Sequence, residues 1–267
     1  MRMTMERPRI GEGHAVWIIS EVGVNHGGSV DTAKRLIDAA VKSGASACKF
    51  QAWVTGPGDP YAHLCLTADQ LAETQAYARE AGILWFATPH TVDAVDILEA
   101  LEVPLYKIGS AGLANPELLR RVGVTGKPVI MSVGMAQPAE IEAAFKPVLQ
   151  QVVALLHCVN SYPTPPDELN LRRIQNLKDW YIFDIGYSSH YPGVVDAIAA
   201  VAMGACVIEK HITLSRNQEG PDHKASLRPF EFSKMVRAIR ALESMMGHGR
   251  IEPQPCEMEL RAKVWGS

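Results

Sequence analysis

Length, composition and charge exclude several classes of protein. The chain has 267 residues, 47% of them hydrophobic, which favours one large barrel because α/β barrels commonly run to about 250 residues. Its 26 basic and 29 acidic residues give a formal net charge of −3, which argues against a nucleic-acid backbone or an anionic membrane as partner. Five cysteines without CxxC spacing argue against a disulfide framework and a structural zinc site. The polar segment 1–14 lacks the apolar region of a signal peptide, so we expect a cytoplasmic protein.

Short apolar segments alternate with stretches of helical periodicity, the pattern of repeated βα units around a parallel sheet. The predicted strands are 16–23, 47–52, 84–89, 105–110, 128–134, 152–160, 181–190 and 206–213. The predicted helices include 29–43, 67–81, 91–101, 137–149, 193–203 and 229–246. Ser29 and Thr67 precede two of these helices and can cap their free N–H groups. No linker interrupts the series and the tail after residue 250 is too short for a domain, so the pattern predicts one (β/α)₈ TIM barrel domain over 1–267.

Reactive side chains lie at the carboxyl ends of the predicted strands. In chain order they are Glu21, Lys49, Gln51, Thr88, Lys107, Ser110, Ser132, Asn160, His190, Glu209 and His211. In a parallel barrel these ends open onto one face, where barrel enzymes build their sites. An open doubly wound sheet is the alternative fold. It usually has a glycine-rich phosphate loop after the first strand, and the segment GVNHGGS is only weakly similar to one.

His190 and His211 end the seventh and eighth predicted strands. Side chains alternate faces along a strand, so Glu209 and His211 share one face while Lys210 takes the other. Adjacent parallel strands lie about 4.8 Å apart, which allows two imidazoles to converge on one ion. Two histidines leave room for water and substrate oxygens, which suits a catalytic divalent ion. The alternative is a pair of hydrogen-bonded structural histidines.

Lys49 and Lys107 end strands that would otherwise be buried, where an unpaired ammonium is costly. An anionic ligand would relieve that cost. Further donors for a phosphate and a carboxylate come from Ser110, Ser132 and Asn160. The alternative is that each lysine pairs with Glu21 or Glu209. Glu21 is equally a candidate general base or a ligand for substrate hydroxyls.

Three other side chains near strand ends, His26, His157 and Cys158, are also of the types that pack as satisfied core groups. Cys158 has no base beside it in sequence, so we do not propose a thiol nucleophile. Asp222 and His223 follow the eighth strand in the segment EGPDHKAS. We expect both on the face that contacts substrate.

A series of segments resembles the sialic acid synthases, which condense phosphoenolpyruvate with an N-acetylated amino sugar such as N-acetylmannosamine. The matching segments are ISEVGVNHGGSVDTAKRLIDAAVKSGASACKFQ, FATPH, YKIGS, SVGM, LLHCVNSYPTP, GYSSHYPG, AAVAMGACVIEKHITL and GPDHKAS. They span residues 17–227 in the family's order. This resemblance is more specific than any single motif.

The resemblance implies roles for individual positions. His190 and His211 match a pair of manganese ligands, with Mg²⁺ as another possible ion, Glu21 matches an essential glutamate, and Asp222 an aspartate near metal and sugar. Positions on the sugar side are Gln51 and Tyr162. Positions that cradle phosphoenolpyruvate are Lys49, Thr88, Lys107, Ser110, Ser132, Asn160 and Ser188.

The implied reaction joins the methylene carbon of phosphoenolpyruvate to a sugar aldehyde polarised by the ion. Water then adds and phosphate leaves, which gives a 2-keto-3-deoxy sugar acid. The expected partners are therefore phosphoenolpyruvate and an aldose, and the resemblance also suggests a homodimer.

Three departures from the family pattern predict an altered acceptor. The usual C-terminal antifreeze-like domain, which supplies an arginine to the partner's sugar site, has no counterpart before Ser267. Gly112 stands where the family has a glutamate, and Ser189 stands where an aspartate precedes the metal-binding histidine. Two alternatives remain: a metal-dependent keto-sugar-acid lyase or aldolase, and a non-catalytic sugar-phosphate-binding homologue.

Overall fold

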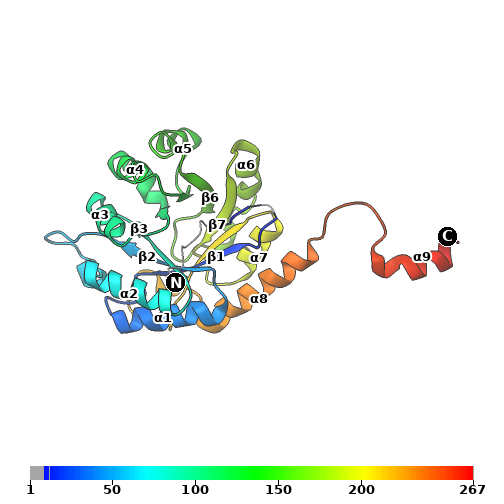
Figure 1. The fold of residues 1–267 in the computed structure, drawn as a ribbon, viewed down its shortest axis with the longest axis horizontal. Coiled ribbons are helices and arrows are strands. Elements are labelled where there is room, and N and C mark those ends of the chain that lie inside the picture. Colours follow the sequence, from blue (N-terminus) through cyan, green and yellow to red (C-terminus); the bar gives the residue numbers. More distant parts are fainter. Residues whose placement is uncertain (1–8, 12, 267) are drawn as a thin grey trace.

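Eight parallel strands close into one barrel in sequence order, with helices around it (Figure 1), in a computed structural model that describes residues 9–11 and 13–266. The strands are β1 Trp17–Gly23, β2 Ala47–Ala52, β3 Leu84–Pro89, β4 Tyr106–Ile108, β5 Val129–Ser132, β6 Val152–Cys158, β7 Asp184–Ser189 and β8 Val207–His211. The helices are α1 Val30–Ser43, α2 Ala68–Glu80, α3 Val92–Ala100, α4 Pro116–Gly123, α5 Pro138–Phe145, α6 Arg173–Trp180, α7 Val195–Ala202, α8 Pro229–Met245 and α9 Met258–Trp265. Because β8 pairs with β1, the predicted barrel is confirmed and the doubly wound alternative is wrong.

The predicted helix starts at Ser29 and Thr67 are confirmed in atomic detail. The Ser29 hydroxyl accepts a hydrogen bond from the Thr32 amide, and Thr67 forms a capping box with Gln70. Each cap satisfies amides that have no partner within the first helical turn.

Helices α4 and α6 were not among those predicted, and several strands are shorter than predicted. Helix α4 is nevertheless signalled locally, since the Asn115 side chain caps the Leu118 amide and Pro116 occupies the first turn. Ser110 begins a short 3-10 helix just beyond β4, and Asn160 lies in the loop just beyond β6, both at the carboxyl end of the barrel. That position leaves both side chains free to face a ligand rather than a neighbouring strand.

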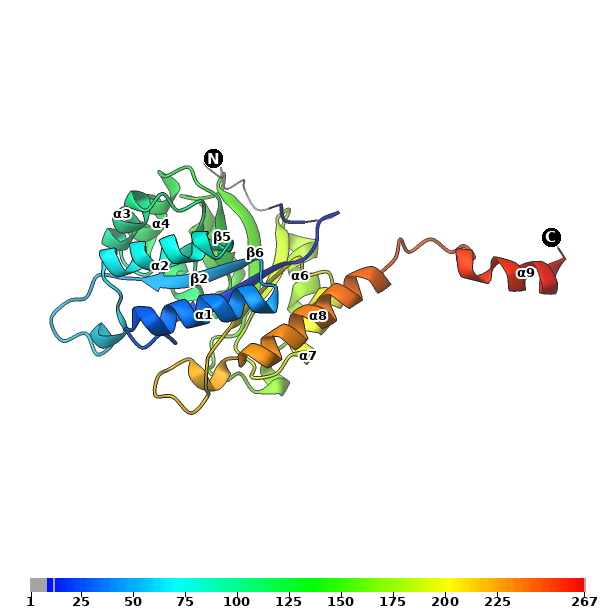
Figure 2. The ribbon, with the colours of Figure 1, turned by 60° about the horizontal axis from the view of Figure 1, so that its bottom comes forward.

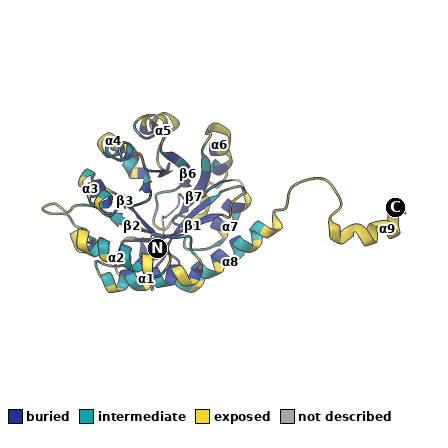
Figure 3. Ribbon diagram, viewed as in Figure 1, coloured by how far each residue is buried: buried dark blue, intermediate teal, exposed yellow. Residues whose placement is uncertain are grey.

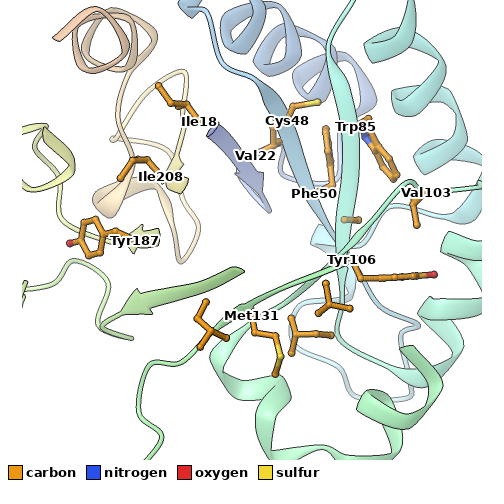
Figure 4. Packing of buried hydrophobic residues seen from close by; sticks show 14 of the residues in the cluster. Ile18, Val22, Cys48, Phe50, Trp85, Val103, Tyr106, Met131, Tyr187 and Ile208 are labelled. Carbon is orange, nitrogen blue, oxygen red and sulfur yellow. The ribbon is translucent and has the colours of Figure 1, made fainter. Parts of the chain in front are cut away.

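The main hydrophobic core fills the space between the strands and the surrounding helices. The strands are buried while the outward helix faces are exposed (Figure 3). Phe50 and Trp85 stack at 5.6 Å between centroids, and Tyr106 and Met131 extend the same cluster around the ring (Figure 4). This packing anchors each strand from outside and leaves the barrel interior available for other chemistry.

The barrel interior changes from apolar to polar along its axis. At the amino ends of the strands a closed apolar floor is formed by Trp17, Ile19, Ala47, Phe86, Leu105, Ile130, Ala154, Leu156 and Val207. Alternate strand residues face the same side, so the next inward positions two residues later form a second layer. That layer consists of the buried polar residues Glu21, Lys49, Thr88, Lys107, Ser132, Ser188 and Glu209. The carboxyl end of the barrel, called the mouth below, is therefore lined with charge above a dry floor.

The residues after α8 lead away from the barrel to α9, which is exposed along its length (Figure 2). No helix among the described residues is long and apolar enough to cross a membrane. The predicted polar segment 1–14 lies partly outside the described residues, at positions 1–8 and 12.

Acid is expected to destabilise the fold through His157, which is fully buried on β6 and stacks on Tyr187. Its Nε2–H donates to the Leu169 carbonyl, while burial lowers the pKa of the ring to about 4. The unfolded chain takes up a proton near pH 6.5 and the folded chain does not, so stability is lost as pH falls from about 6.5 to 4. His157→Gln should lose about 3 kcal/mol less than wild type over this interval in chemical denaturation. Parallel pH curves for the two proteins would contradict the assignment.

Candidate active site

Two buried lysines meet two buried glutamates at the mouth. Lys49 Nζ lies 3.0 Å from Glu21 and 3.6 Å from Glu209, and Lys107 Nζ lies 3.3 Å from Glu209. The ion pairing that the sequence left open as an alternative is therefore present. It does not exclude an anionic ligand, because two ammonium groups share Glu209.

The two glutamates differ in their affinity for a proton. Burial raises the pKa of Glu21 to about 7, against the opposing charge of Lys49. Burial acts in the same direction on Glu209, but Lys107 and Lys49 outweigh it and lower the pKa of that carboxyl to about 2. Glu209 is therefore a fixed negative charge that holds both lysines in place, whereas Glu21 can exchange a proton near neutral pH.

Neutral donors surround the lysines and complete a group called the anion cradle here, which consists of Lys49, Lys107, Ser110, Ser132, Asn160 and the backbone of Gly134. The Gly134 amide donates to the Ser110 hydroxyl at 3.0 Å. Ser132 Oγ and Asn160 Oδ1 are buried without a hydrogen-bond partner. Buried polar atoms are normally satisfied, so the Ser132 hydroxyl points to a ligand that accepts its hydrogen bond.

Gly134 allows the backbone to pass close to two side chains of the cradle. A Cβ at this position would lie 2.3 Å from Asn160 Oδ1 and 2.9 Å from Ser110 Oγ. Gly134→Ala should therefore weaken the binding of an anionic ligand such as phosphoenolpyruvate by about tenfold or more in calorimetry, since the Asn160 and Ser110 side chains must move. Gly56→Ala is the matched control, because a Cβ there meets nothing within 4 Å. Equal affinities for the two variants would remove Gly134 from the cradle.

His190 and His211 lie beside the cradle, with ring centroids 5.4 Å apart. Burial lowers the pKa of each ring to about 3, helped by the neighbouring imidazole at His190 and by Lys49 at His211. Both rings are thus neutral at pH 7, the form that binds a metal. The Val159 carbonyl accepts from His190 Nδ1 at 2.7 Å, which fixes the proton there and leaves Nε2 with a free lone pair.

The donor set at the histidine pair fits a divalent ion. His211 Nδ1 is buried without a hydrogen bond and lies 3.6 Å from an Asp222 carboxylate oxygen. Among the described residues no group of three or more His, Cys, Asp and Glu side chains is arranged as a metal site. An ion at this position would therefore need oxygen ligands from substrate or water in addition to the imidazoles.

Gly23 allows β1 to approach this pair closely. Its φ of +55° is left-handed, and a Cβ would lie 3.0 Å from Asp222 Oδ2 and 3.3 Å from the His211 ring. Asp222 reaches the site from the loop after β8, as predicted. The His223 Nδ1 atom instead lies 2.7 Å from Thr213 Oγ1, within the segment that follows β8.

A second buried ion pair lies on the outer side of β7 and β8. Lys210 contacts Asp196 of α7 at 3.2 Å, and both bond the Ser189 hydroxyl. The prediction that Lys210 faces away from Glu209 and His211 is thus confirmed. The Val159 carbonyl accepts a hydrogen bond from His190 Nδ1, so His190 has a supporting partner although Ser189 stands at the position of the family's aspartate.

The remaining predicted residues also gather at the mouth. The Tyr162 ring lies against the His190 ring, with 3.8 Å between the ring centroids. The Gln51 amide donates a hydrogen bond to the Glu21 carboxylate at 3.0 Å. Lys49 donates to Thr88 at 2.8 Å, and Ser188 donates to Glu209 at 2.8 Å. Burial raises the pKa of the nearby Cys158 thiol to about 11, which agrees with its exclusion as a nucleophile.

Apart from Gln51 and Asp222, sequence reasoning missed the walls of a pocket of about 380 Å³ beside the histidines, called the acceptor pocket here. It is lined by Val24, Gln51, Trp53, Val54, Asp59, Tyr61, Leu64, His90, Thr91, Pro221 and Asp222. Five of these residues, more than from any other segment, come from the connection between β2 and α2. The clustering of aromatic side chains in that loop was the available signal.

Residues 57–251 match the family model that is described as the NeuB family. The chain belongs to the NeuB family. It is 38% identical to the N,N'-diacetyllegionaminic acid synthase of Campylobacter jejuni, over 87% of this chain and 78% of that protein. It is 35% identical to the N-acetylneuraminate-9-phosphate synthase of Mus musculus, over 96% and 78% of the two chains. These relatives confirm the predicted resemblance and a transferase of the sialic acid synthase type.

One solved structure is similar to this NeuB barrel in both sequence and fold. It is the crystal structure of an N-acetylneuraminic acid synthetase from Leptospira borgpetersenii in complex with citrate. The two chains share 36% identity and a TM-score of 0.89, over 99% of this chain and 98% of the other. Sequence and fold thus agree on the family.

Proposed function

We propose that this protein joins phosphoenolpyruvate to an aldose and releases phosphate, producing a 2-keto-3-deoxy sugar acid. The observation that carries the proposal is the adjacency of the anion cradle and the histidine pair within one barrel mouth. The cradle suits a small molecule with a carboxylate and a phosphate, and the acceptor pocket opens beside it. The relatives' names support synthesis of sialic acid-like products.

The residues of the chain would divide the work by position. Lys49 and Lys107 hold the anionic substrate and stabilise the phosphate as the C–O bond to it breaks. Glu21 would take the proton from the attacking water, because its carboxyl lies 3.0 Å from the Lys49 ammonium and burial raises its pKa. A divalent ion held by His190 and His211, with Mn²⁺ as the expected ion, would supply Lewis-acid polarisation of the aldehyde.

The direct test is phosphate release from phosphoenolpyruvate in the presence of Mn²⁺ and a panel of aldoses, with mass spectrometry of the product. Carbon–carbon bond formation supports the synthase. Release of pyruvate from keto-sugar acids without phosphate would instead favour the lyase or aldolase. Tight binding of phosphoenolpyruvate without product from any acceptor would favour the non-catalytic homologue.

The expected compartment and assembly are proposals too. The five cysteines are free of disulfides, which supports a reducing cytoplasm. A homodimer is proposed on the resemblance, and light scattering of the purified chain tests it. The relatives do not identify the acceptor sugar, since one relative is named for a phosphorylated product and another for an unphosphorylated one.

A further inference from the structure

The acceptor pocket opens directly onto the reacting groups. Gln51 lines the pocket and also donates to Glu21, while Asp222 lines it and lies 3.6 Å from His211. An aldose seated there would present its aldehyde carbon to the mouth and the rest of its chain to the pocket walls. The walls therefore select among acceptors.

No described side chain that lines the pocket offers a positive charge to a phosphate group. Among the residues that the structure describes, none of those lining the pocket is a lysine or an arginine. Desolvation in the crowded mouth, and then the charges of Lys49 and Lys107, lower the pKa of His90 to about 4, so its ring is neutral at pH 7. A phosphate monoester carries nearly two negative charges and normally requires cationic or clustered N–H donors.

The charges that the pocket does contain are negative. Asp222 closes one side, and Asp59 faces in from the loop after β2. Asp59 accepts from the Trp53 indole at 3.1 Å and from the Tyr61 amide at 2.8 Å, so this carboxylate organises the loop. A second anion beside these carboxylates would be repelled.

The remaining walls are apolar and partly aromatic. Trp53, Val54, Tyr61 and Leu64 line one side of the pocket. The Trp53 ring is fixed by its bond to Asp59 and by an edge contact with His90, at 6.4 Å between centroids. A rigid indole beside aliphatic side chains suits the C–H face of a sugar and an apolar substituent on it.

We propose that the acceptor pocket takes an uncharged aldose with an apolar substituent and discriminates against aldose phosphates, with Trp53 as a specificity-determining residue. The inference rests on the proposed condensation and names its substrate class. Discrimination arises because a phosphate entering the pocket loses its hydration and gains no cation.

Initial rates of phosphoenolpyruvate consumption test the proposal with three probes: N-acetylmannosamine, its 6-phosphate and mannose. We expect kcat/KM for the neutral N-acetyl sugar to exceed that for the 6-phosphate by about tenfold or more, and mannose to be the poorer neutral sugar. Equal or better use of the 6-phosphate overturns the proposal.

A charge introduced into the wall sharpens the test. Val54 is 44% exposed and lines the pocket, so Val54→Lys adds a cation there, and Val54→Met is the neutral control of comparable length. The ratio of 6-phosphate to neutral kcat/KM should rise about tenfold in Val54→Lys relative to Val54→Met. An unchanged ratio contradicts the role of charge.

Measurements of sugar binding distinguish failure of this inference from failure of the proposed function. Quenching of tryptophan fluorescence by each aldose, compared between wild type and Trp53→Phe, reports occupancy of the pocket without turnover. If no acceptor is consumed, the condensation fails, yet Trp53-dependent binding of the neutral sugar still supports the pocket assignment. Tighter binding of the 6-phosphate, or no binding of either sugar, overturns it.

Discussion

Replacing His211 with alanine is expected to weaken Mn²⁺ binding by about a hundredfold or more and to abolish turnover. The ring is buried, neutral at pH 7 and has an Nδ1 atom without a hydrogen bond, so it is free to bind an ion. His190→Ala should have the same effect, because Nε2 of that ring is unprotonated. The measurement is Mn²⁺ titration by electron paramagnetic resonance, which reports free ion independently of activity.

His157→Gln is the matched control for the histidine pair. This residue is equally buried but lies on the outer side of β6, where its Nε2 bonds Leu169. Its replacement should leave Mn²⁺ affinity within about twofold of wild type, since no ligand changes. Unchanged Mn²⁺ binding in both His190→Ala and His211→Ala would place the ion elsewhere or remove it from the mechanism.

Lys107→Met is expected to lower kcat/KM for phosphoenolpyruvate by about a thousandfold, with most of the loss visible in binding. Lys107 is 2% exposed and its ammonium pairs only with Glu209 among the ion pairs described. Removing it leaves Glu209 to neutralise Lys49 alone, so the local positive charge that attracts an anion is lost. Methionine keeps the length of the side chain and limits the cavity.

Calorimetric titration of phosphoenolpyruvate without metal checks this second expectation separately from catalysis. Lys127→Met is the matched control, because Lys127 also pairs with a glutamate, Glu99 at 2.6 Å, but lies before β5 at the opposite end of the barrel. Thermal unfolding of both variants monitors the cost of breaking each pair. Normal affinity in Lys107→Met would refute the anion cradle.

Strand periodicity was sufficient to predict much of the site. In β8 the alternation of faces put Glu209 and His211 inside the barrel and Lys210 outside, and the contacts with Lys107 and Asp196 confirm it. Parallel pairing of consecutive strands then brought the strand ends to one mouth. Local physical rules sufficed here because the direction of a strand side chain depends on its position in the strand.

These local rules could not predict the contacts between loops. The acceptor pocket combines Trp53, His90 and Asp222 from the loops after three different strands, and only their closure in space makes a wall. The partner of His190 is likewise a backbone carbonyl, that of Val159, which carries no signal in the side-chain sequence.

The sequence by itself determined the barrel, its polar mouth and the side chains of the cradle and the histidine pair, because strand and helix periods encode which side chains face inward. Tertiary structure alone decided how the charges are shared among Glu21, Glu209 and the two lysines. It also decided which atoms lack partners and what lines the acceptor pocket. Those properties depend on distances between segments far apart in the chain, and burial sets the strength of charge interactions over such distances.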